Sequence, residues 1–264
     1  MTSSTYRLDN DWEKARQRLE GLEAMGDPGT IRHLEDLGVG AGWNCLEAGA
    51  GGGSITRWLA DRVAPEGSVV AVDINTRFVE DLDEPNVEVR QHDIIADDLP
   101  AEAFDLVHTR AVIGHLPERE RALENLVSAL APDGVLLAEE MDFVSAVAVP
   151  GVDSGQAELF STFVEAHNRV FEGRFDVFYG RRVASDLERF GLEDVQCEGR
   201  TRILRGGSLG ARAWKLTFEQ LSDVMMDAAL VTVQDVHDIM DVMDDPAFVF
   251  QSMVFVAAWG RKAA

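Results

Sequence analysis

Between residues 43 and 138, short apolar runs alternate with stretches of helical periodicity. The runs have the length and composition of buried strands, and they lie at residues 43–48, 68–73, 87–91, 104–109 and 135–138. The intervening stretches place apolar side chains at steps of three and four residues, as amphipathic helices do, and they lie at residues 55–63, 77–82 and 117–130. This alternation predicts a parallel sheet with helices on both faces.

The flanking regions follow other patterns. Before the alternation, residues 11–25 and 31–37 predict two helices, which are separated by a Gly-Asp-Pro-Gly turn at 26–29. After it, the pattern predicts helices at residues 152–171, 181–190, 214–230 and 233–243, and strands at 195–204 and 248–259. We therefore predict one domain over residues 1–264, with N-terminal helices at 1–40, a core at 41–142 and insertions at 143–180 and 205–247.

The chain is strongly acidic, with a net charge of −23. Binding to nucleic acids and to anionic membranes depends on basic side chains, so both kinds of partner are disfavoured. No apolar run is long enough to span a bilayer, and the polar start lacks the pattern of a signal peptide. We expect a cytoplasmic protein that acts on a small molecule, and the sequence leaves open whether the chain forms a homodimer.

The sequence contains two cysteines, Cys45 and Cys197, each in strand-like apolar surroundings. We predict that both are reduced and buried. A metal site would need clustered cysteine or histidine ligands, and the sequence has no such cluster, so no metal is predicted.

A glycine-rich stretch at residues 46–53, Leu-Glu-Ala-Gly-Ala-Gly-Gly-Gly, follows the first predicted strand and opens a helix. Glycines let the backbone turn sharply and approach a ligand, and the helix start presents unpaired N–H groups to that ligand. The dinucleotide fingerprint does not fit, because its last small residue would fall on Ser54 or Thr56. The spacing that fits is acid-x-Gly-x-Gly-x-Gly, formed by Glu47, Gly49, Gly51 and Gly53.

Polar side chains also end several predicted strands. Glu47, Asp73, Asp93 and Arg110 all fall at carboxyl ends, and ligands of open parallel sheets bind at those ends. Asp73 follows the glycine turn by about twenty residues, where a carboxylate can accept both hydroxyls of a ribose. The pattern therefore predicts a ligand site at this edge of the sheet.

These motifs resemble those of the class I S-adenosylmethionine (SAM)-dependent methyltransferases, in particular the small-molecule methyltransferases of the UbiE type. Besides the glycine turn, the resemblance rests on Asp73, on Asp93, on Phe-Asp-Leu-Val at 104–107 and on Leu-Ala-Pro-Asp-Gly at 130–134. It covers residues 43–140 closely and the stretch to residue 204 more weakly. Asp133 replaces a glycine of the family pattern, which a turn tolerates.

The resemblance implies a Rossmann-like α/β fold, in which a seven-stranded sheet with an antiparallel last strand carries helices on both faces and helical lid insertions. It also implies that SAM is the cofactor and that residues 41–142 bind it. An acid at the place of Asp93 meets the adenine amino group in the family. The implied cofactor-binding residues are Glu47, Gly49, Ala50, Gly51, Gly53, Asp73, Ile74, Asp93, Ile94 and Arg110.

Methyl transfer from a sulfonium requires mainly that the acceptor atom is placed against the methyl carbon. A general base is needed only where the acceptor must lose a proton. His115 follows the fourth predicted strand and is our candidate base, because its ordinary pKa suits proton transfer at neutral pH. The alternative is that His115 only packs or caps the helix that Pro117 opens.

The two insertions exceed the minimal fold and are rich in aromatic residues. We predict that they form a lid over an apolar acceptor site, with His167, Tyr179, Trp214 and Met225 as substrate-binding residues. The alternative for each of these side chains is that it packs the lid rather than touching the acceptor.

The sequence therefore predicts a SAM-dependent methyltransferase for a small-molecule acceptor such as a specialised metabolite. Two other functions stay open. One is a SAM-binding protein that transfers no methyl group, either a regulator or a non-methylating catalyst. The other, less supported by the glycine spacing, is a nicotinamide-dependent oxidoreductase. Whether the acceptor atom is oxygen, nitrogen or carbon cannot be read from the sequence.

Overall fold

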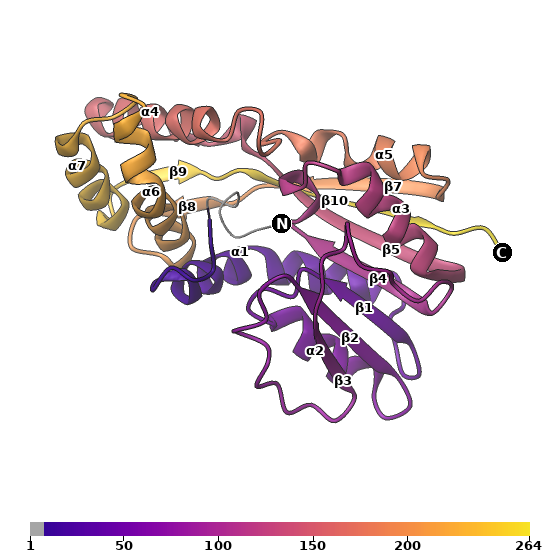
Figure 1. Cartoon of the computed structure of the whole chain (residues 1–264). Coiled ribbons are helices and arrows are strands. Elements are labelled where there is room, and N and C mark those ends of the chain that lie inside the picture. Colours follow the sequence, from indigo (N-terminus) through magenta and orange to yellow (C-terminus); the bar gives the residue numbers. More distant parts are fainter. Residues whose placement is uncertain (1–7) are drawn as a thin grey trace. The chain divides into compact units, whose positions relative to one another are not determined.

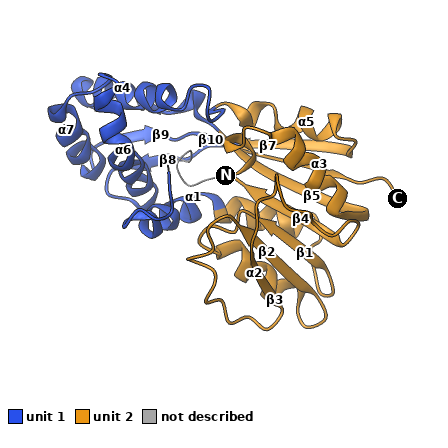
Figure 2. Ribbon diagram, viewed as in Figure 1, with its two compact units in different colours: residues 1–26, 142–177, 200–254 blue, residues 27–141, 178–199, 255–264 orange. Residues whose placement is uncertain are grey.

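The computed structural model describes residues 8–264 (Figure 1). The polar start of the predicted N-terminal region, residues 1–7, lies outside the described residues. The chain divides into two compact units (Figure 2). Unit 1 holds the residues up to 26 together with 142–177 and 200–254, and unit 2 holds residues 27–141, 178–199 and 255–264.

Unit 2 contains a seven-stranded sheet, and the strand order is β3-β2-β1-β4-β5-β10-β7. Its strands are β1 (Asn44–Ala48), β2 (Ser68–Asp73), β3 (Val87–Gln91), β4 (Phe104–Arg110), β5 (Leu130–Asp142), β7 (Glu193–Arg200) and β10 (Val254–Arg261). Strand β1 lies between β2 and β4 and runs parallel to both, and β3 and β5 extend the parallel part. The last strand, β10, is antiparallel, which confirms the predicted fold class.

Helices cover both faces of this sheet, as the alternation of apolar runs predicts. They are α1 (Ala15–Asp36), α2 (Ser54–Val63), α3 (Arg119–Ala129), α5 (Val183–Arg189) and the short helices η1 (Ile113–His115) and η3 (Tyr179–Arg181). On one face, Leu34 of α1 and Leu59 of α2 pack against the central strands. On the other face, Leu123 of α3 and Leu187 of α5 do the same. The central strands are therefore buried on both sides.

The N-terminal helix corrects one prediction. Instead of two helices with a turn at 26–29, α1 is continuous and contains Pro28. The physical reason lies in its side chains: Thr30 is fully buried, and Asp27 accepts a hydrogen bond from Arg110. Such tertiary contacts outweigh the weak helix preference of the Gly-Asp-Pro-Gly segment.

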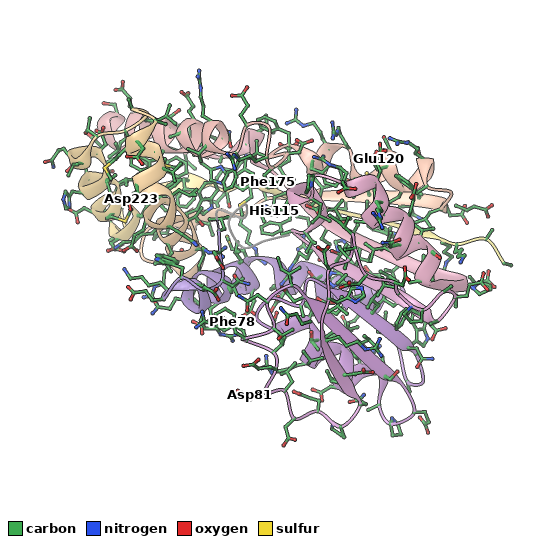
Figure 3. The ribbon with its side chains drawn as sticks, in the orientation of Figure 1. Phe78, Asp81, His115, Glu120, Phe175 and Asp223 are labelled. Carbon is green, nitrogen blue, oxygen red and sulfur yellow. The ribbon has the colours of Figure 1, made fainter. Side chains whose placement is uncertain are left out.

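Residues 77–82 correct a second prediction, because they form turns and no helix. Their backbone hydrogen bonds are local, from Val79 N–H to the Thr76 carbonyl at 2.8 Å and from Leu82 N–H to the Val79 carbonyl at 3.1 Å. Figure 3 shows Phe78 and Asp81 on this irregular segment. A stretch of six residues is too short to propagate a helix without strong packing.

Unit 1 contains three longer helices and a small sheet. The helices are α4 (Ser154–Val170), α6 (Leu209–Asp227) and α7 (Val233–Asp244), and η2 (Phe143–Ser145) is a short turn of helix. The sheet has the order β6-β9-β8, with β6 (Val147–Ala148), β8 (Ile203–Arg205) and β9 (Val249–Gln251) all paired antiparallel. This sheet was not predicted.

The small sheet forms because two predicted strands break in the middle. The strand predicted at 195–204 becomes β7 and β8, and the one predicted at 248–259 becomes β9 and β10. At the second break, the Ser252 carbonyl accepts the hydroxyls of Ser145 and Thr201 at 3.0 and 2.9 Å. These hydrogen bonds hold the chain where it leaves the small sheet.

The core of unit 1 is aromatic. Phe160 lies 4.8 Å from Phe250 between ring centroids, and Phe163 lies 5.2 Å from Phe218. All four rings are fully buried. The inserted segments thus pack around an apolar centre of their own.

The two cysteines differ. Cys45 in β1 is buried, and burial raises the pKa of its thiol above the ordinary range. Cys197 is exposed, so the prediction that both are buried was wrong for it. The reason is its place in β7, which is the edge strand of the sheet and has a neighbouring strand on one side only.

Candidate functional site

The glycine turn that follows β1 depends on its glycines. Gly49, Gly51 and Gly53 have φ angles of 83°, 54° and 81°, which side chains disfavour. A Cβ at Gly49 would lie 2.2 Å from Val112 Cγ2, so the space is closed as well. The N–H groups of Gly49 and Ala50 donate to the Val72 carbonyl at 2.8 and 3.1 Å, which ties the turn to the end of β2.

Asp73, the last residue of β2, holds the same turn from the side. Its Oδ2 accepts the Gly51 N–H at 3.0 Å and its Oδ1 accepts the Asn75 N–H at 2.9 Å. Burial raises the pKa of Asp73 above its usual range, although backbone N–H groups that include those of Asn75 and Gly51 partly offset the effect. The next side chain, Ile74, is 44% exposed.

Asp93 and Ile94 follow β3. Asp93 Oδ1 accepts the Ile95 N–H at 2.9 Å and so shapes its own turn. The Ile94 side chain is buried in the core beneath α3, and Asn125 donates to its carbonyl at 2.9 Å. Any contact of Ile94 with the cofactor would therefore fall to its backbone, and its assignment as a binding residue stays a prediction.

Glu47 of β1 does not stand alone at the glycine turn. Its register partner in β4 is His108, whose Nδ1 lies 2.6 Å from Glu47 Oε2. The other ring nitrogen, Nε2, lies 3.3 Å from Glu139 Oε2 in β5. Burial disfavours a charged imidazole, but the two carboxylates outweigh it and raise the pKa of His108 to about 9.

Sequence reasoning missed His108 because it sits in the middle of an apolar strand. A signal was nevertheless present. His108 and Glu139 are among the polar residues of two neighbouring strands that are mostly apolar, and a buried polar group requires a partner.

Helix α1 joins this cluster from the outside. The Thr30 hydroxyl donates to Glu139 Oε2, and His33 Nδ1 lies 3.3 Å from Glu139 Oε1. Burial would raise the pKa of Glu139, but hydrogen bonds from His108 and His33 and the charge of Arg110 hold it well below its usual range. Glu139 therefore stays ionised inside the fold.

Arg110 ends β4 and continues the network. Its Nη1 donates to Thr30 Oγ1 and its Nη2 donates to Asp27 Oδ1, both at 2.8 Å. Asp27 also accepts the Ser54 hydroxyl at 3.1 Å, so the first residue of α2 is tied to α1. Arg110 was predicted to bind the cofactor, and the structure shows that it also anchors α1.

One atom of this cluster is available to a ligand. Among the residues that the structure describes, no donor approaches Glu47 Oε1, although the Glu47 side chain is largely buried. An ionised carboxylate accepts several hydrogen bonds, so a carboxylate with one oxygen still available can bind an ammonium group. The exposed Ile74 offers an apolar contact at the adjacent strand end, and the two together fit the amino and adenine ends of SAM.

His115 lies in η1, directly after β4 (Figure 3). Glu140 holds this segment, because its carboxylate accepts the N–H groups of Val112, Ile113 and Gly114 at 3.2, 2.8 and 3.3 Å. Burial raises the pKa of Glu140 to about 7, although the same three donors oppose the shift. Val112 also fills the space beside Gly49. Glu140 therefore holds both the residue that packs against the glycine turn and the segment that carries His115.

Comparisons with known proteins agree with this arrangement. Residues 46–136 match the family model of the methyltransferase domain. The chain is 30% identical over 187 residues to Methyltransferase str3 of Strobilurus tenacellus, a match that covers 68% of this chain and 62% of that protein. These comparisons support a class I SAM-dependent methyltransferase domain in this chain.

This methyltransferase also resembles solved structures of low sequence identity, which show the fold alone. Phosphoethanolamine N-methyltransferase 2 of Haemonchus contortus has a TM-score of 0.61 at 14% identity, over 100% of this chain and 61% of that chain. The (4+2)-cyclase SpnF has a TM-score of 0.54 at 16% identity, over 97% of this chain and 84% of that chain. The methyltransferase spans less than two thirds of the length of the curated relatives that it matches.

Three of the four predicted substrate-binding residues lie in unit 1 and are buried: His167, Trp214 and Met225. The His167 ring packs 4.5 Å from the Phe143 ring between centroids, and Trp214 Nε1 donates to Ser252 Oγ at 2.9 Å. Burial lowers the pKa of His167 to about 4, despite its hydrogen bond with Asn168. Packing alone accounts for these positions in the described structure.

The fourth, Tyr179, lies in unit 2 and is fully buried. Its hydroxyl donates to Asp186 Oδ2 at 2.9 Å, and the Arg119 guanidinium stacks 4.9 Å from its ring centroid. Burial and the nearby Asp186 carboxylate raise the pKa of Tyr179 above its usual range. Hydrogen bonding, stacking and burial thus account for the position of the Tyr179 side chain within unit 2.

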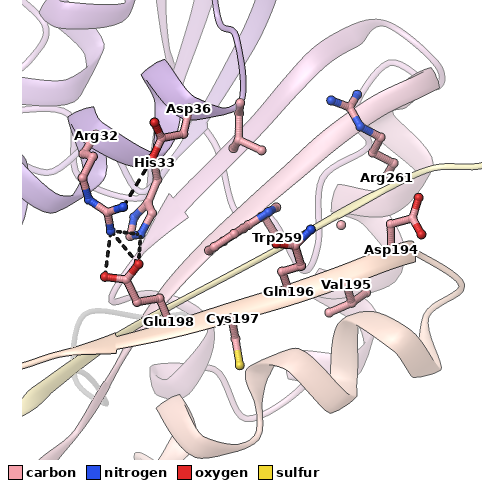
Figure 4. A pocket seen from close by; sticks show the side chains of 12 residues that line it. Arg32, His33, Asp36, Asp194, Val195, Gln196, Cys197, Glu198, Trp259 and Arg261 are labelled. Atoms are coloured by element: carbon pink, nitrogen blue, oxygen red, sulfur yellow. Dashed lines mark hydrogen bonds and ion pairs between the residues drawn. The ribbon is translucent and has the colours of Figure 1, made fainter.

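Unit 2 also has a pocket of about 930 Å³ between the end of α1 and strands β7 and β10 (Figure 4). Trp259 forms part of its wall, and Arg32 donates to both carboxylate oxygens of Glu198 at 2.7 Å. Because this pocket lies at the β10-β7 side of the sheet, it is separate from the strand ends that carry Glu47 and Asp73.

Within residues 8–264, no group of three or more metal-ligating side chains comes together. Over the same part of the chain, none of the helices combines the length and the apolar character that crossing a bilayer requires.

Proposed function

We propose that this methyltransferase transfers the methyl group of SAM to a small-molecule acceptor. The observation that carries the proposal is the open Oε1 of Glu47 beside a turn that only glycines can form. Bound SAM would supply a methyl group on a sulfonium, and that methyl group needs no further activation for transfer. The related str3 protein is named a methyltransferase, in agreement with this proposal.

The chain's own residues would then have distinct tasks. Glu47 Oε1 accepts hydrogen bonds from the cofactor's ammonium group, and Asp73 accepts the ribose hydroxyls. The exposed Ile74 would pack on the adenine ring, and Asp93 would meet the adenine amino group. Arg110 still has unused guanidinium N–H donors beyond those to Thr30 and Asp27, and these could bind the carboxylate of the cofactor.

Calorimetry tests the cofactor. We expect the purified chain to bind SAM and S-adenosylhomocysteine, and Ile74→Ser to weaken both by about ten-fold because an exposed apolar contact is lost. The variant should keep its thermal stability, since the side chain is partly exposed. A well-folded wild type that binds neither compound would refute the proposed function.

Turnover tests the reaction. A panel of phenols, amines and carboxylic acids is incubated with SAM, and S-adenosylhomocysteine and the methylated product are followed by mass spectrometry. We expect both to form together with at least one class of acceptor. Substrates that are polyanions should be poor, since the net charge of −23 repels them. The cytoplasmic location and the lack of nucleic-acid and membrane partners remain part of this proposal.

We propose His115 as the general base for acceptors that must lose a proton. His115→Ala would then lower kcat by about 10²- to 10⁴-fold while the Kd for SAM stays unchanged. His237, an exposed histidine of α7, is the matched control, and His237→Ala should leave kcat unchanged. Equal turnover of the two variants would remove His115 from the mechanism.

We also propose that the inserted segments 143–180 and 205–247 determine which acceptor is used, as a lid over the acceptor site. The buried Trp214, His167 and Met225 would act by shaping that lid, and Tyr179 by packing at the end of the first segment. Trp214→Phe is expected to raise the KM for the acceptor with little change in the Kd for SAM. Equal weakening of acceptor and cofactor would contradict the proposal.

A second function is favoured by one specific observation. The fold is shared with SpnF, a protein named as a cyclase rather than a methyltransferase. If this chain used SAM without transferring its methyl group, SAM would be recovered intact after conversion of the true substrate. The same mass-spectrometric measurement separates the two functions.

A further inference from the structure

We infer that His108 is a positioning residue that holds Glu47 in the orientation in which its free oxygen receives the cofactor. The inference rests on the proposed function and concerns His108 of β4, a residue to which the family resemblance assigns no role. His108 itself is fully buried in the middle of β4 and touches no open surface. Its action on the cofactor would therefore pass entirely through Glu47.

The two oxygens of the Glu47 carboxylate have different surroundings. Oε2 is 2.6 Å from His108 Nδ1, while Oε1 has no donor among the described residues. A carboxylate on a flexible two-carbon stem has several rotamers, and one short hydrogen bond to a rigid ring in a central strand selects one of them. The bond thus fixes where Oε1 points.

His108 is in turn held from its other side. Nε2 lies 3.3 Å from Glu139 Oε2, and Glu139 is anchored to α1 by Thr30 and His33. The ring therefore cannot rotate without breaking a second contact. The chain of contacts runs from α1 through β5 and β4 to the glycine turn.

Charge explains why a histidine stands between the two acids. Two buried carboxylates would repel one another, and an uncompensated buried charge is costly. A protonated imidazole joins Glu47 to Glu139 and leaves the three groups with one net negative charge. Arg110 and Asp27, the charged neighbours on β4 and α1, pair with each other. One remaining negative charge complements the single net positive charge of SAM.

A purely structural role is the alternative, and a matched pair of substitutions separates the two. The amide nitrogen of Asn occupies the place of a histidine Nδ1, whereas that of Gln reaches the place of Nε2. His108→Asn keeps a donor to Glu47 and loses the one to Glu139. His108→Gln keeps the donor to Glu139 and releases Glu47. Both variants lose the charge and the ring, so both should lose similar stability.

Calorimetry with S-adenosylhomocysteine reads out the difference. We expect the Kd of His108→Asn to stay within about three-fold of the wild type and that of His108→Gln to rise by about ten-fold or more. His237→Gln is the control, since His237 is exposed on α7 and has no part in this chain of contacts, and it should keep the wild-type Kd. Equal Kd values for the Asn and Gln variants would overturn the inference, whereas a wild type without affinity would refute the proposed function itself.

Nuclear magnetic resonance of the unmodified protein gives a second test that does not depend on the variants folding. With ¹⁵N-labelled histidine, the His108 Nδ1 signal should shift as S-adenosylhomocysteine binds, and the shift should saturate with the calorimetric Kd. His167, which is buried in unit 1 and bonded to Asn168, is the internal control and should not shift. A His108 signal that stays unchanged at saturation would overturn the inference.

Discussion

Each unit of the chain contains a fully buried histidine, and the two differ in charge. His108 in unit 2 lies between two carboxylates, which raise its pKa to about 9. His167 in unit 1 lies among aromatic rings, and burial lowers its pKa to about 4. At neutral pH the first is protonated and the second is neutral.

Burial alone leaves a histidine neutral, as it does His167, and the two carboxylate partners of His108 reverse that effect. The same difference also separates the two units by chemistry. Unit 2 collects charged groups at the strand ends that are proposed to hold a cationic cofactor. Unit 1 collects aromatic rings around α4 and α6, which suits the proposed handling of an apolar acceptor.

The strongest test of the comparison removes an acid from the charged cluster. Glu139→Ala would leave His108, His33 and Arg110 without their shared partner, and we expect unfolding free energy to fall by about 3–5 kcal/mol in urea titrations. Glu198→Ala is the control. It also removes an ion-pair partner of α1, but the Arg32–Glu198 pair is partly exposed, so the unfolding free energy should fall by only about 0–1 kcal/mol. A small loss in both variants would show that the cluster is not strongly coupled.

The change of the unfolding free energy at alkaline pH tests the protonation of His108. Its pKa of about 9 in the folded state lies above the unfolded value of about 6.5, so its contribution is complete below pH 6.5 and is lost as the pH rises through 9. The loss amounts to about 3 kcal/mol. Urea midpoints between pH 6 and pH 9.5 should therefore fall less in His108→Asn than in the wild type. Parallel curves would mean that His108 is not protonated in the fold.

The acid limb reports on His167 with the opposite sign. Its folded pKa of about 4 lies below about 6.5, so the unfolded chain takes up a proton first and stability falls as the pH drops from 6.5 to 4, by about 3 kcal/mol. His167→Leu should flatten this limb. The buried Glu140, whose pKa is raised to about 7, makes the fold more stable as the pH falls over part of the same range. Its effect is common to the wild type and His167→Leu, so subtracting the stability curve of one from that of the other removes it. An unchanged slope in the variant would contradict the comparison.

The smallest effect concerns a neutral hydrogen bond in unit 1. Ser252→Ala leaves the Trp214 indole N–H buried without its acceptor, which should cost about 1–3 kcal/mol. In a Trp214→Phe background the same substitution should cost almost nothing, because the donor is already gone. A double-mutant cycle in urea measures the difference, and equal costs in both backgrounds would show that the bond contributes no stability.

Much of unit 2 could be predicted from the sequence because its signals are local. The apolar runs of β2 and β3 have the observed bounds, and the glycine turn identifies itself by residue type. The family resemblance supplied the antiparallel last strand, which no local pattern shows. The packing of α1 through Pro28 and the network around His108 join residues that are far apart in the chain, and no local pattern contains them.

Unit 1 was harder to predict for a physical reason. Its helices show a clear period, but β6, β8 and β9 are two or three residues long, which is too short for an alternating pattern. The residues proposed for substrate binding were chosen for their aromatic or polarisable side chains, and such side chains also build cores. Trp214 and Met225 are buried for this reason, and only acceptor kinetics can show whether they also shape a binding site.

The interleaving of the two units along the chain has a consequence for synthesis. Unit 1 lacks β9 and unit 2 lacks β10 until residues 249–261 have left the ribosome. Many multidomain proteins fold one domain after another as they emerge, but neither core here can close early. A nascent chain would carry an unpaired β5 edge and uncovered phenylalanines at the same time, and both would be protected only once β9 and β10 have emerged.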